Sequence, residues 1–324
     1  MQAVSVVVPV YNSETSLEEL VARLDAVLKR QKLAGEIILV NDASRDGSWG
    51  KVRELCARYP FVQGIDMMRN YGQHNALLCG IRLAKNEAIV TIDDDLQHPP
   101  EEIPRLLEKL EQGYDVVYGT PVTEDHGFLR NIASRVTKIA LQNAMGAETA
   151  RRVSAYRVFR TPLRNAFAQY QGSYVSIDVL LTWGTTRFSS VPVKHAERPY
   201  GVTNYTFRKL LTHAMNMMTG FSVLPLELAS LTGFVMTFFG LVVLGYVLIR
   251  YAIYGGRVPG FSFLASLVSI FSGAQMFAMG IMGEYLARMH FRSLERPAYT
   301  VRQHVTADAR QQDTGRNACA TGRI

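Results

Sequence analysis

The fold is decided by residues 88–100, which read AIVTIDDDLQHPP. The first five residues are apolar or β-branched and predict a short buried strand. The carboxylates of Asp93, Asp94 and Asp95 leave the end of that strand together. In an open α/β sheet, ligands bind at the carboxyl ends of the strands. The stretch therefore predicts one strand of a parallel sheet and, directly after it, a binding site.

Three adjacent carboxylates repel one another and raise each other's pKa unless positive charge lies among them. A hard divalent cation, Mg²⁺ or Mn²⁺, would supply that charge, because such ions prefer oxygen ligands. The cation would in turn bridge a diphosphate. The alternative interpretation is a solvated acidic loop in front of the next helix, whose first turn contains Glu101 and Glu102.

Strand and helix patterns alternate on both sides of this stretch. Apolar runs predict further strands, at 4–10, 37–40, 62–68 and 114–118. Apolar residues at helical spacing predict helices, at 17–28, 76–84 and 103–110. We expect Ser13 or Thr15 to cap the first helix. The alternation predicts an α/β fold with a mostly parallel, Rossmann-like sheet and helices on both faces.

Asp42 follows the second predicted strand, where an acidic residue commonly accepts hydrogen bonds from a nucleotide's base or ribose. An Asx turn between Asp42 and Gly47 is the alternative. The first strand is not followed by Gly-x-Gly-x-x-Gly, and the sequence contains no Gly-Lys-Ser/Thr. Dinucleotide-binding and P-loop sites are therefore not expected.

Two long runs, 228–249 and 258–283, contain no charged residue. About 20 apolar residues span a bilayer, so we expect two transmembrane helices at about 228–250 and 261–284, joined by a Gly/Pro turn at 255–260. A buried helical pair in a soluble core is the alternative. Glu284 lies at the end of the second run, and the sequence assigns it no role.

The net charge of +7 is concentrated beside these runs. We interpret the basic residues at 208, 209, 250, 288, 292 and 296 as flanking the outer ends of the helix pair, with only Arg257 in the turn. The positive-inside rule then predicts a multi-pass protein of the inner membrane, with both termini and the catalytic domain in the cytoplasm. We expect these basic residues to interact with the lipid bilayer and not with nucleic acid. Three scattered cysteines and the lack of a signal peptide agree with a reducing compartment.

Two stretches, 127–145 and 204–226, combine an apolar stripe with basic residues, which is typical of helices in the headgroup layer. For 127–145, packing on the sheet is the alternative. The second stretch leads directly into the first uncharged run. The expected domains are listed in order: 1–203 a cytoplasmic catalytic domain, 204–226 a membrane-surface segment, 227–290 the two transmembrane helices, and 291–324 a polar tail.

Four motifs, in this order, resemble those of the family 2 glycosyltransferases. They are VPVYN at 8–12, ND-x-S-x-DGS at 41–48, RN-x-G at 69–72 and D-x-DLQHP at 93–99. Within that family, the sequence from about residue 3 to 290 is similar to the polyprenyl-phosphate glycosyltransferases. The resemblance implies the GT-A fold and transfer of a sugar from a nucleotide-diphosphate sugar, expected to be a UDP-sugar, to a polyprenyl phosphate such as undecaprenyl phosphate.

The resemblance also implies roles for individual residues. Asp93, Asp95 and Gln97 would hold Mg²⁺ or Mn²⁺ and the diphosphate, and Asp42 would hold the uracil side. Arg198, in the family's Arg-x-x-Gly-x-Ser-Lys-Tyr motif, would hold phosphate near the acceptor, so Asp93, Asp95 and Arg198 are the expected catalytic residues. The other expected substrate-binding residues are Pro9, Tyr11, Glu14, Arg69, Gly72, Asp94, Arg130, Arg157, Thr203 and Asn204.

The sequence departs from the family pattern at two places. Asn41 stands where many members have Asp, and Thr203-Asn204 stand where many have Ser-Lys. One expected cation is therefore missing, and Arg130, Arg157 or Lys209 are candidates to replace it.

The implied reaction needs no general base, because a lipid phosphate is already an anion at neutral pH. The site must position the two anionic substrates and neutralise the leaving diphosphate. Asp178 is the one spare acid, and we favour a structural role for it.

Two other functions remain open. A processive polysaccharide synthase of the same fold would carry Gln-x-x-Arg-Trp and more membrane helices, whereas Trp183 is followed by Gly184. A non-catalytic, membrane-anchored sugar-nucleotide-binding protein would not need Asp93, Asp95 and Gln97 together. The transferred sugar and any homo-oligomer are not determined by the sequence.

Overall fold

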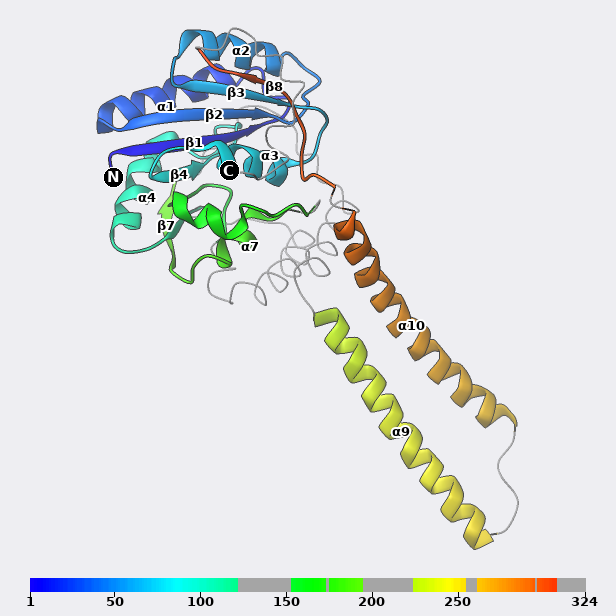
Figure 1. The fold of residues 1–324 in the computed structure, drawn as a ribbon. Helices are drawn as coiled ribbons and strands as arrows, with labels where there is room; N and C mark the ends of the chain where they lie inside the picture. Colours follow the sequence, from blue (N-terminus) through cyan, green and yellow to red (C-terminus); the bar gives the residue numbers. More distant parts are fainter. Residues whose placement is uncertain (122–152, 173–174, 195–223, 255–260, 295, 308–324) are drawn as a thin grey trace.

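The computed structural model of the 324-residue chain describes residues 1–121, 153–172, 175–194, 224–254, 261–294 and 296–307. Within these ranges, eight strands form one sheet in the order β7-β5-β6-β4-β1-β2-β3-β8 (Figure 1). The strands are β1 Ala3–Val10, β2 Ala34–Asn41, β3 Val62–Met67, β4 Ala88–Thr91, β5 Val116–Pro121, β6 Arg157–Arg160, β7 Phe188–Val193 and β8 Val301–Val305.

The centre of the sheet is parallel. β1 pairs in parallel with β2 and β4, and β2 pairs in parallel with β3. β7 also runs parallel to its neighbour β5, whereas β6 is antiparallel to both β4 and β5 and β8 is antiparallel to β3. The predicted α/β fold with a mostly parallel sheet is therefore confirmed.

Helices cover both faces of the sheet (Figure 1). The helical segments are α1 Leu17–Gln31, α2 Ser48–Arg58, α3 Gln73–Leu83, η1 Pro100–Glu102, α4 Ile103–Glu111, η2 Thr161–Phe167, α7 Ile177–Thr182, α9 Leu224–Tyr254 and α10 Phe261–Ser293. In β1, Val6 and Val8 pack in the core with α1, α2 and α4, whereas Val7 packs in the core with α3 and α7. Burial on both faces explains why the sequence of β1 is almost continuously apolar.

The first helix begins later than the expected caps. Ser16 occupies the N-cap position of α1, so the prediction of Ser13 or Thr15 is wrong. Ser13 is used elsewhere: its N–H donates to Ser48 Oγ (2.8 Å) and its hydroxyl donates to Asp94 Oδ2 (2.5 Å). Because the Ser13 hydroxyl is bonded to Asp94, it does not cap the N-terminus of α1.

The prediction that residues 291–324 form a polar tail is wrong for residues 291–293 and 301–305. α10 continues to Ser293, and residues 301–305 form β8 against β3. β6 and β7 were not predicted either. β8 is an edge strand with no fully buried residue, so its sequence lacks the apolar pattern that marks a central strand. Residues 308–324 lie outside the described part of the chain.

α9 and α10 form a hairpin that extends away from the sheet (Figure 1). Among the described residues there is one candidate membrane span, Pro225–Ile253 in α9, and no part of its most apolar window is buried in the structure. Because α9 continues to Tyr254, Arg250 lies at the turn end of the hairpin and not at its outer end, contrary to our expectation. Arg288 lies toward the end of α10 that is away from the turn, as expected.

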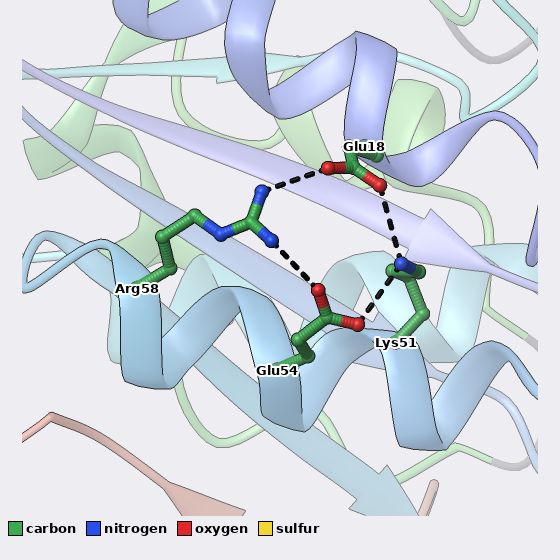
Figure 2. Close-up of polar contacts among 4 residues, drawn as sticks. All are labelled: Glu18, Lys51, Glu54 and Arg58. Atoms are coloured by element: carbon green, nitrogen blue, oxygen red, sulfur yellow. Dashed lines mark hydrogen bonds and ion pairs between the residues drawn. The ribbon is translucent and has the colours of Figure 1, made fainter.

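Four charged side chains join α1 to α2 at the surface (Figure 2). Glu18 of α1 lies 3.2 Å from Lys51 Nζ and 2.7 Å from an Arg58 guanidinium nitrogen, and Glu54 lies 2.9 Å and 2.8 Å from the same two groups. These partners lower the pKa of Glu18 and raise that of Arg58. Because the groups are solvated, the ring aligns the two helices but adds little to stability.

Gly80 of α3 generates a prediction about packing of that helix on the sheet. A Cβ at this position would lie 2.4 Å from Val7 Cγ1 and 3.2 Å from Val40 Cγ2. We therefore expect Gly80→Ala to destabilise the protein by about 1–3 kcal/mol, despite the better helix propensity of alanine. Thermal unfolding of the detergent-purified protein, followed by circular dichroism, measures the change.

Gly50 of α2 is the matched control, because no atom lies within 4 Å of a Cβ built there. We expect Gly50→Ala to raise stability by up to about 1 kcal/mol. Shifts of the same sign for both variants would contradict this account of how α3 packs on the sheet.

Candidate active site

The loops after β1, β2, β3 and β4 meet at one edge of the sheet, because these four strands are parallel. Each loop contains one residue with a positive φ: Asn12 (55°), Ala43 (53°), Gly72 (94°) and Leu96 (61°). Residues other than glycine rarely adopt this backbone conformation, and such strain, present at Asn12, Ala43 and Leu96, is typical of ligand-binding sites. The edge is therefore the candidate active site.

The first two loops are joined by hydrogen bonds. Asn12 N–H donates to Ser44 Oγ (3.0 Å), and Arg45 N–H donates to Asn12 Oδ1 (2.8 Å). Gly47 N–H donates to Glu14 Oε2 (3.0 Å), and a Cβ on Gly47 would collide with the Glu14 carboxylate. Glu14, expected to bind substrate, thus fixes the second loop in this structure.

Asp94 faces the first loop. Its carboxylate accepts hydrogen bonds from Tyr11 N–H (3.0 Å) and from the Ser13 hydroxyl. Burial raises the pKa of Asp94 to about 6, and these two donors oppose that rise. The Tyr11 side chain remains 45% exposed at the rim, whereas Pro9 is buried within β1. Of the residues expected to bind substrate here, Tyr11 and Glu14 are exposed and Pro9 is not.

Asp42 connects the second loop to the third. It is 3% exposed, and its carboxylate accepts the backbone N–H groups of Tyr71 (2.7 Å) and Gly72 (2.8 Å). Burial raises the pKa of Asp42, and the two backbone donors oppose the rise. Arg69, in the same loop, is exposed and its guanidinium lies 4.6 Å from the centre of the Tyr71 ring. Asp42 therefore sets the position of the loop that carries Arg69 and Gly72.

Asp93 and Asp95, like Asp94, are half-buried carboxylates of the fourth loop. Gln73, at the start of α3, donates to Asp93 Oδ1 (2.6 Å), and Gln97 N–H donates to Asp95 Oδ1 (3.1 Å). Burial, together with the charges of Asp95 and Asp94, raises the pKa of Asp93 to about 7. Gln73 was not singled out from the sequence, although it directly follows the RN-x-G motif.

The donor set at this loop fits a divalent cation. Asp93, Asp95 and Gln97 all offer oxygen, and the crowding that raises the pKa of Asp93 is relieved by added positive charge. In the part of the chain that the structure describes, no group of three His, Cys, Asp or Glu side chains converges to hold a metal unaided.

Arg157 lies beneath the carboxylates. It sits in β6 opposite Thr91 of β4, is 1% exposed, and forms an ion pair with Asp178. The Tyr118 hydroxyl donates to the same Asp178 oxygen (3.2 Å). The Arg157 charge lowers the pKa of Asp93. Arg157 was expected to bind substrate, but this structure shows it paired with Asp178 and supporting the carboxylate loop from below.

Four expected site residues, Arg130, Arg198, Thr203 and Asn204, lie outside the described residues. Their roles remain predictions. The structure thus places the residues expected to hold the nucleotide and the metal at one edge of the sheet. It does not describe the residues expected to hold the acceptor phosphate.

The raised pKa values generate a prediction for the protein without metal. Asp93 and Asp94 ionise near pH 7 and pH 6 in the folded chain, whereas an exposed aspartate ionises near about pH 4. The folded protein therefore binds more protons than the unfolded chain between these values, and its stability falls as the pH rises from about 4 to about 7. We expect Asp93→Asn to raise the melting temperature at pH 8 but not near pH 4.

The measurement is thermal unfolding in excess EDTA across this pH range. Glu108→Gln, on the exposed surface of α4, is the control and should leave the pH profile of the wild type unchanged. An Asp93→Asn protein that melts below the wild type at pH 8 would show that the carboxylate stabilises the fold.

Comparison with known proteins places the chain among enzymes. Residues 5–166 match the family described as "Glycosyl transferase family 2". A protein of Photorhabdus laumondii named undecaprenyl-phosphate 4-deoxy-4-formamido-L-arabinose transferase is 34% identical, over 97% of this chain and 97% of its own length. A protein of Pseudomonas savastanoi pv. phaseolicola with the same name is 34% identical, over 94% of this chain and 92% of its own.

The fold also resembles that of a solved structure. Glucosyl-3-phosphoglycerate synthase from Mycobacterium tuberculosis, in complex with Mn²⁺, UDP-glucose and phosphoglyceric acid, aligns with a TM-score of 0.51 and 16% identity. The alignment covers 67% of this chain and 78% of that one. The fold is thus the GT-A fold, and the family match and the length of the alignments show that the chain belongs to glycosyl transferase family 2 and is a glycosyltransferase.

Proposed function

We propose that the protein transfers a sugar from a nucleotide-diphosphate sugar, expected to be a UDP-sugar, to a polyprenyl phosphate such as undecaprenyl phosphate. The observation that carries the proposal is the pair Asp93 and Asp95 at the carboxyl ends of the parallel strands, held by four interlocked loops. The names of the relatives, which specify undecaprenyl phosphate, and the exposed apolar helix α9 support a lipid acceptor.

In the proposed reaction, an oxygen of the lipid phosphate forms a bond to the anomeric carbon while the bond from that carbon to the diphosphate breaks. Mg²⁺ or Mn²⁺ bound by Asp93, Asp95 and Gln97 would neutralise the departing diphosphate. The lipid phosphate brings its own negative charge, so the protein's task is to position the substrates. Asp178 is buried with Arg157 and Tyr118, and this supports a mechanism that uses no general base.

The remaining expected residues are assigned by position. Tyr11 and Arg69 are exposed at the rim and are proposed to contact the nucleotide side, on loops that Asp94 and Asp42 hold. Arg198, with Arg130, Thr203 and Asn204, is proposed to hold the acceptor phosphate. Arg forks suit phosphate because they offer two parallel donors.

Two alternatives are less well supported. A processive synthase needs a channel through the membrane, whereas the helices α9 and α10 form one hairpin in the described chain. A non-catalytic sugar-nucleotide-binding protein is disfavoured by membership of a transferase family and by the carboxylate pair.

A transfer assay tests the proposal. Purified protein is incubated with undecaprenyl phosphate and a panel of UDP-sugars, which includes UDP-4-deoxy-4-formamido-L-arabinose because of the relatives' names. We expect one donor to yield a lipid-linked sugar, and excess EDTA to abolish the reaction. Asp95→Asn should lower turnover by a few orders of magnitude, since loss of metal-borne charge stabilisation costs several kcal/mol.

Glu108→Gln again serves as the control and should retain full turnover. Undiminished transfer in excess chelator would refute the metal dependence. Equal transfer to a water-soluble sugar would refute the lipid acceptor.

We also propose the membrane arrangement expected from the sequence, with α9 and α10 crossing the inner membrane and residues 204–226 lying on its cytoplasmic surface. Although Arg250 lies at the turn end of the hairpin, the distribution of basic residues still favours a cytoplasmic catalytic domain. In the sequence, Arg250 and Arg257 lie between the two uncharged runs, whereas Arg208, Lys209, Arg288, Arg292 and Arg296 lie before the first run or after the second.

Cysteine labelling tests this arrangement. In a background in which Cys56, Cys79 and Cys319 are replaced by alanine, Gly256→Cys should react with a membrane-impermeant maleimide in intact spheroplasts. Gln31→Cys, on the exposed end of α1, should react only after permeabilisation. The reverse pattern would show that the catalytic domain faces the periplasm.

A further inference from the structure

The chain returns from the membrane hairpin to the catalytic domain and adds the last strand, β8, to the sheet (Figure 1). On the way, Ala298 and Tyr299 are buried in the core that also contains α3. The Arg82 guanidinium of α3 lies 5.6 Å from the centre of the Tyr299 ring and donates to its hydroxyl (3.4 Å). The segment that follows α10 is therefore anchored to the domain before β8 begins.

β8 contains a β-bulge at Arg302. Gln303 pairs with Asp66 and Val301 pairs with Met67, which leaves Arg302 as the additional residue. A bulge redirects the side chain of its extra residue. Arg302 donates from one guanidinium nitrogen to Asp66 Oδ2 (3.3 Å) and from another to the carbonyl of Met68 (2.9 Å).

Met68 is the first residue after β3, and the C-terminal segment holds it on both sides. Its N–H donates to the carbonyl of Thr300 (2.9 Å), and its carbonyl accepts from Arg302. The residues that follow Met68 are Arg69 to Gly72, the loop whose amides Asp42 binds. The start of this loop is therefore held by Thr300 and Arg302, and its end is held by Asp42.

The same arginine is linked to the second loop through Asp66 and Asn41. Asp66 is 3% exposed, and its other carboxylate oxygen accepts the Asn41 amide (2.7 Å). The Asn41 oxygen in turn accepts Ser44 N–H (3.3 Å), in the loop that follows β2. Asn41 stands where many family members have Asp. Here an amide is required to donate to Asp66, whereas a second carboxylate would repel it.

We propose that Arg302 is a positioning residue for the nucleotide-sugar site: it holds the loops after β2 and β3 in their binding arrangement and ties them to the segment that follows the membrane hairpin. The assignment rests on the proposed function, in which the nucleotide binds at these loops. The Arg302 side chain is 55% exposed, so its ion pair adds little to global stability. Its two contacts instead fix where one loop begins.

Kinetics of Arg302→Ala and Arg302→Lys test the proposal. We expect Arg302→Ala to raise KM for the nucleotide sugar about tenfold, the size expected for a lost hydrogen bond to a charged group, while kcat and KM for the lipid change by less than about twofold. Arg302→Lys should restore part of the affinity, because a single ammonium replaces only one of the two contacts at a time.

Arg58→Ala is the matched control. Arg58 is a similarly exposed arginine that binds two carboxylates between α1 and α2 (Figure 2). Its removal should leave both KM values and kcat unchanged.

Hydrogen–deuterium exchange supplies a readout that needs no substrate. The amides of Met68, Tyr71 and Gly72 are bonded to Thr300 and Asp42, so they should exchange faster in Arg302→Ala and at the wild-type rate in Arg58→Ala. Unchanged exchange would overturn the proposal, and so would an effect confined to the KM of the lipid. If the wild type transfers no sugar, the proposed function fails, and the exchange rates still decide whether Arg302 holds the loops.

Discussion

The carboxylates of Asp93, Asp94 and Asp95 repel one another, and the arrangement of the surrounding loops depends on the contacts that hold these three groups in place. Each carboxylate is held from a different direction: Asp94 by the first loop, Asp93 by Gln73 of α3, and Asp95 by the backbone of its own loop. Arg157, whose charge lowers the pKa of Asp93, approaches from β6 below. Three neighbouring carboxylates are thereby kept in place at the edge of the sheet, where a cation and a diphosphate would neutralise their charge.

Two clusters of buried polar side chains support this edge from inside the sheet. One is the Arg157–Asp178 pair with the Tyr118 hydroxyl, and the other is Asp66 with Asn41. Burying such groups is costly unless each finds its partner. Because the partners come from separate strands and helices, the loops above them are fixed only when the whole sheet has formed.

The sequence predicted the elements that are buried on both faces. The strands β1 to β5 and the helices α1, α3 and α4 carry apolar patterns that predicted them, whereas α2, between β2 and β3, was missed. The motifs that follow the strands lie at one edge of the sheet, as expected for loops after parallel strands. β6, β7 and β8 were missed because they are short or partly exposed, and their pairing depends on neighbours that are distant in the sequence. The same reason applies to the site. Residue type pointed to Asp42, Glu14 and Arg157, but only tertiary contacts show that these side chains hold other parts of the protein.

The position of β8 at the edge of the sheet has a consequence for biosynthesis. Translation proceeds from the N-terminus, so α9 and α10 leave the ribosome before residues 301–305 do. Until then β3 has an open edge of unpaired backbone groups, and the loop after it lacks its contacts with Thr300 and Arg302. The last strand of the sheet is therefore added only after α9 and α10 have been synthesised, and a nascent chain cannot complete this edge of the sheet before these two helices exist.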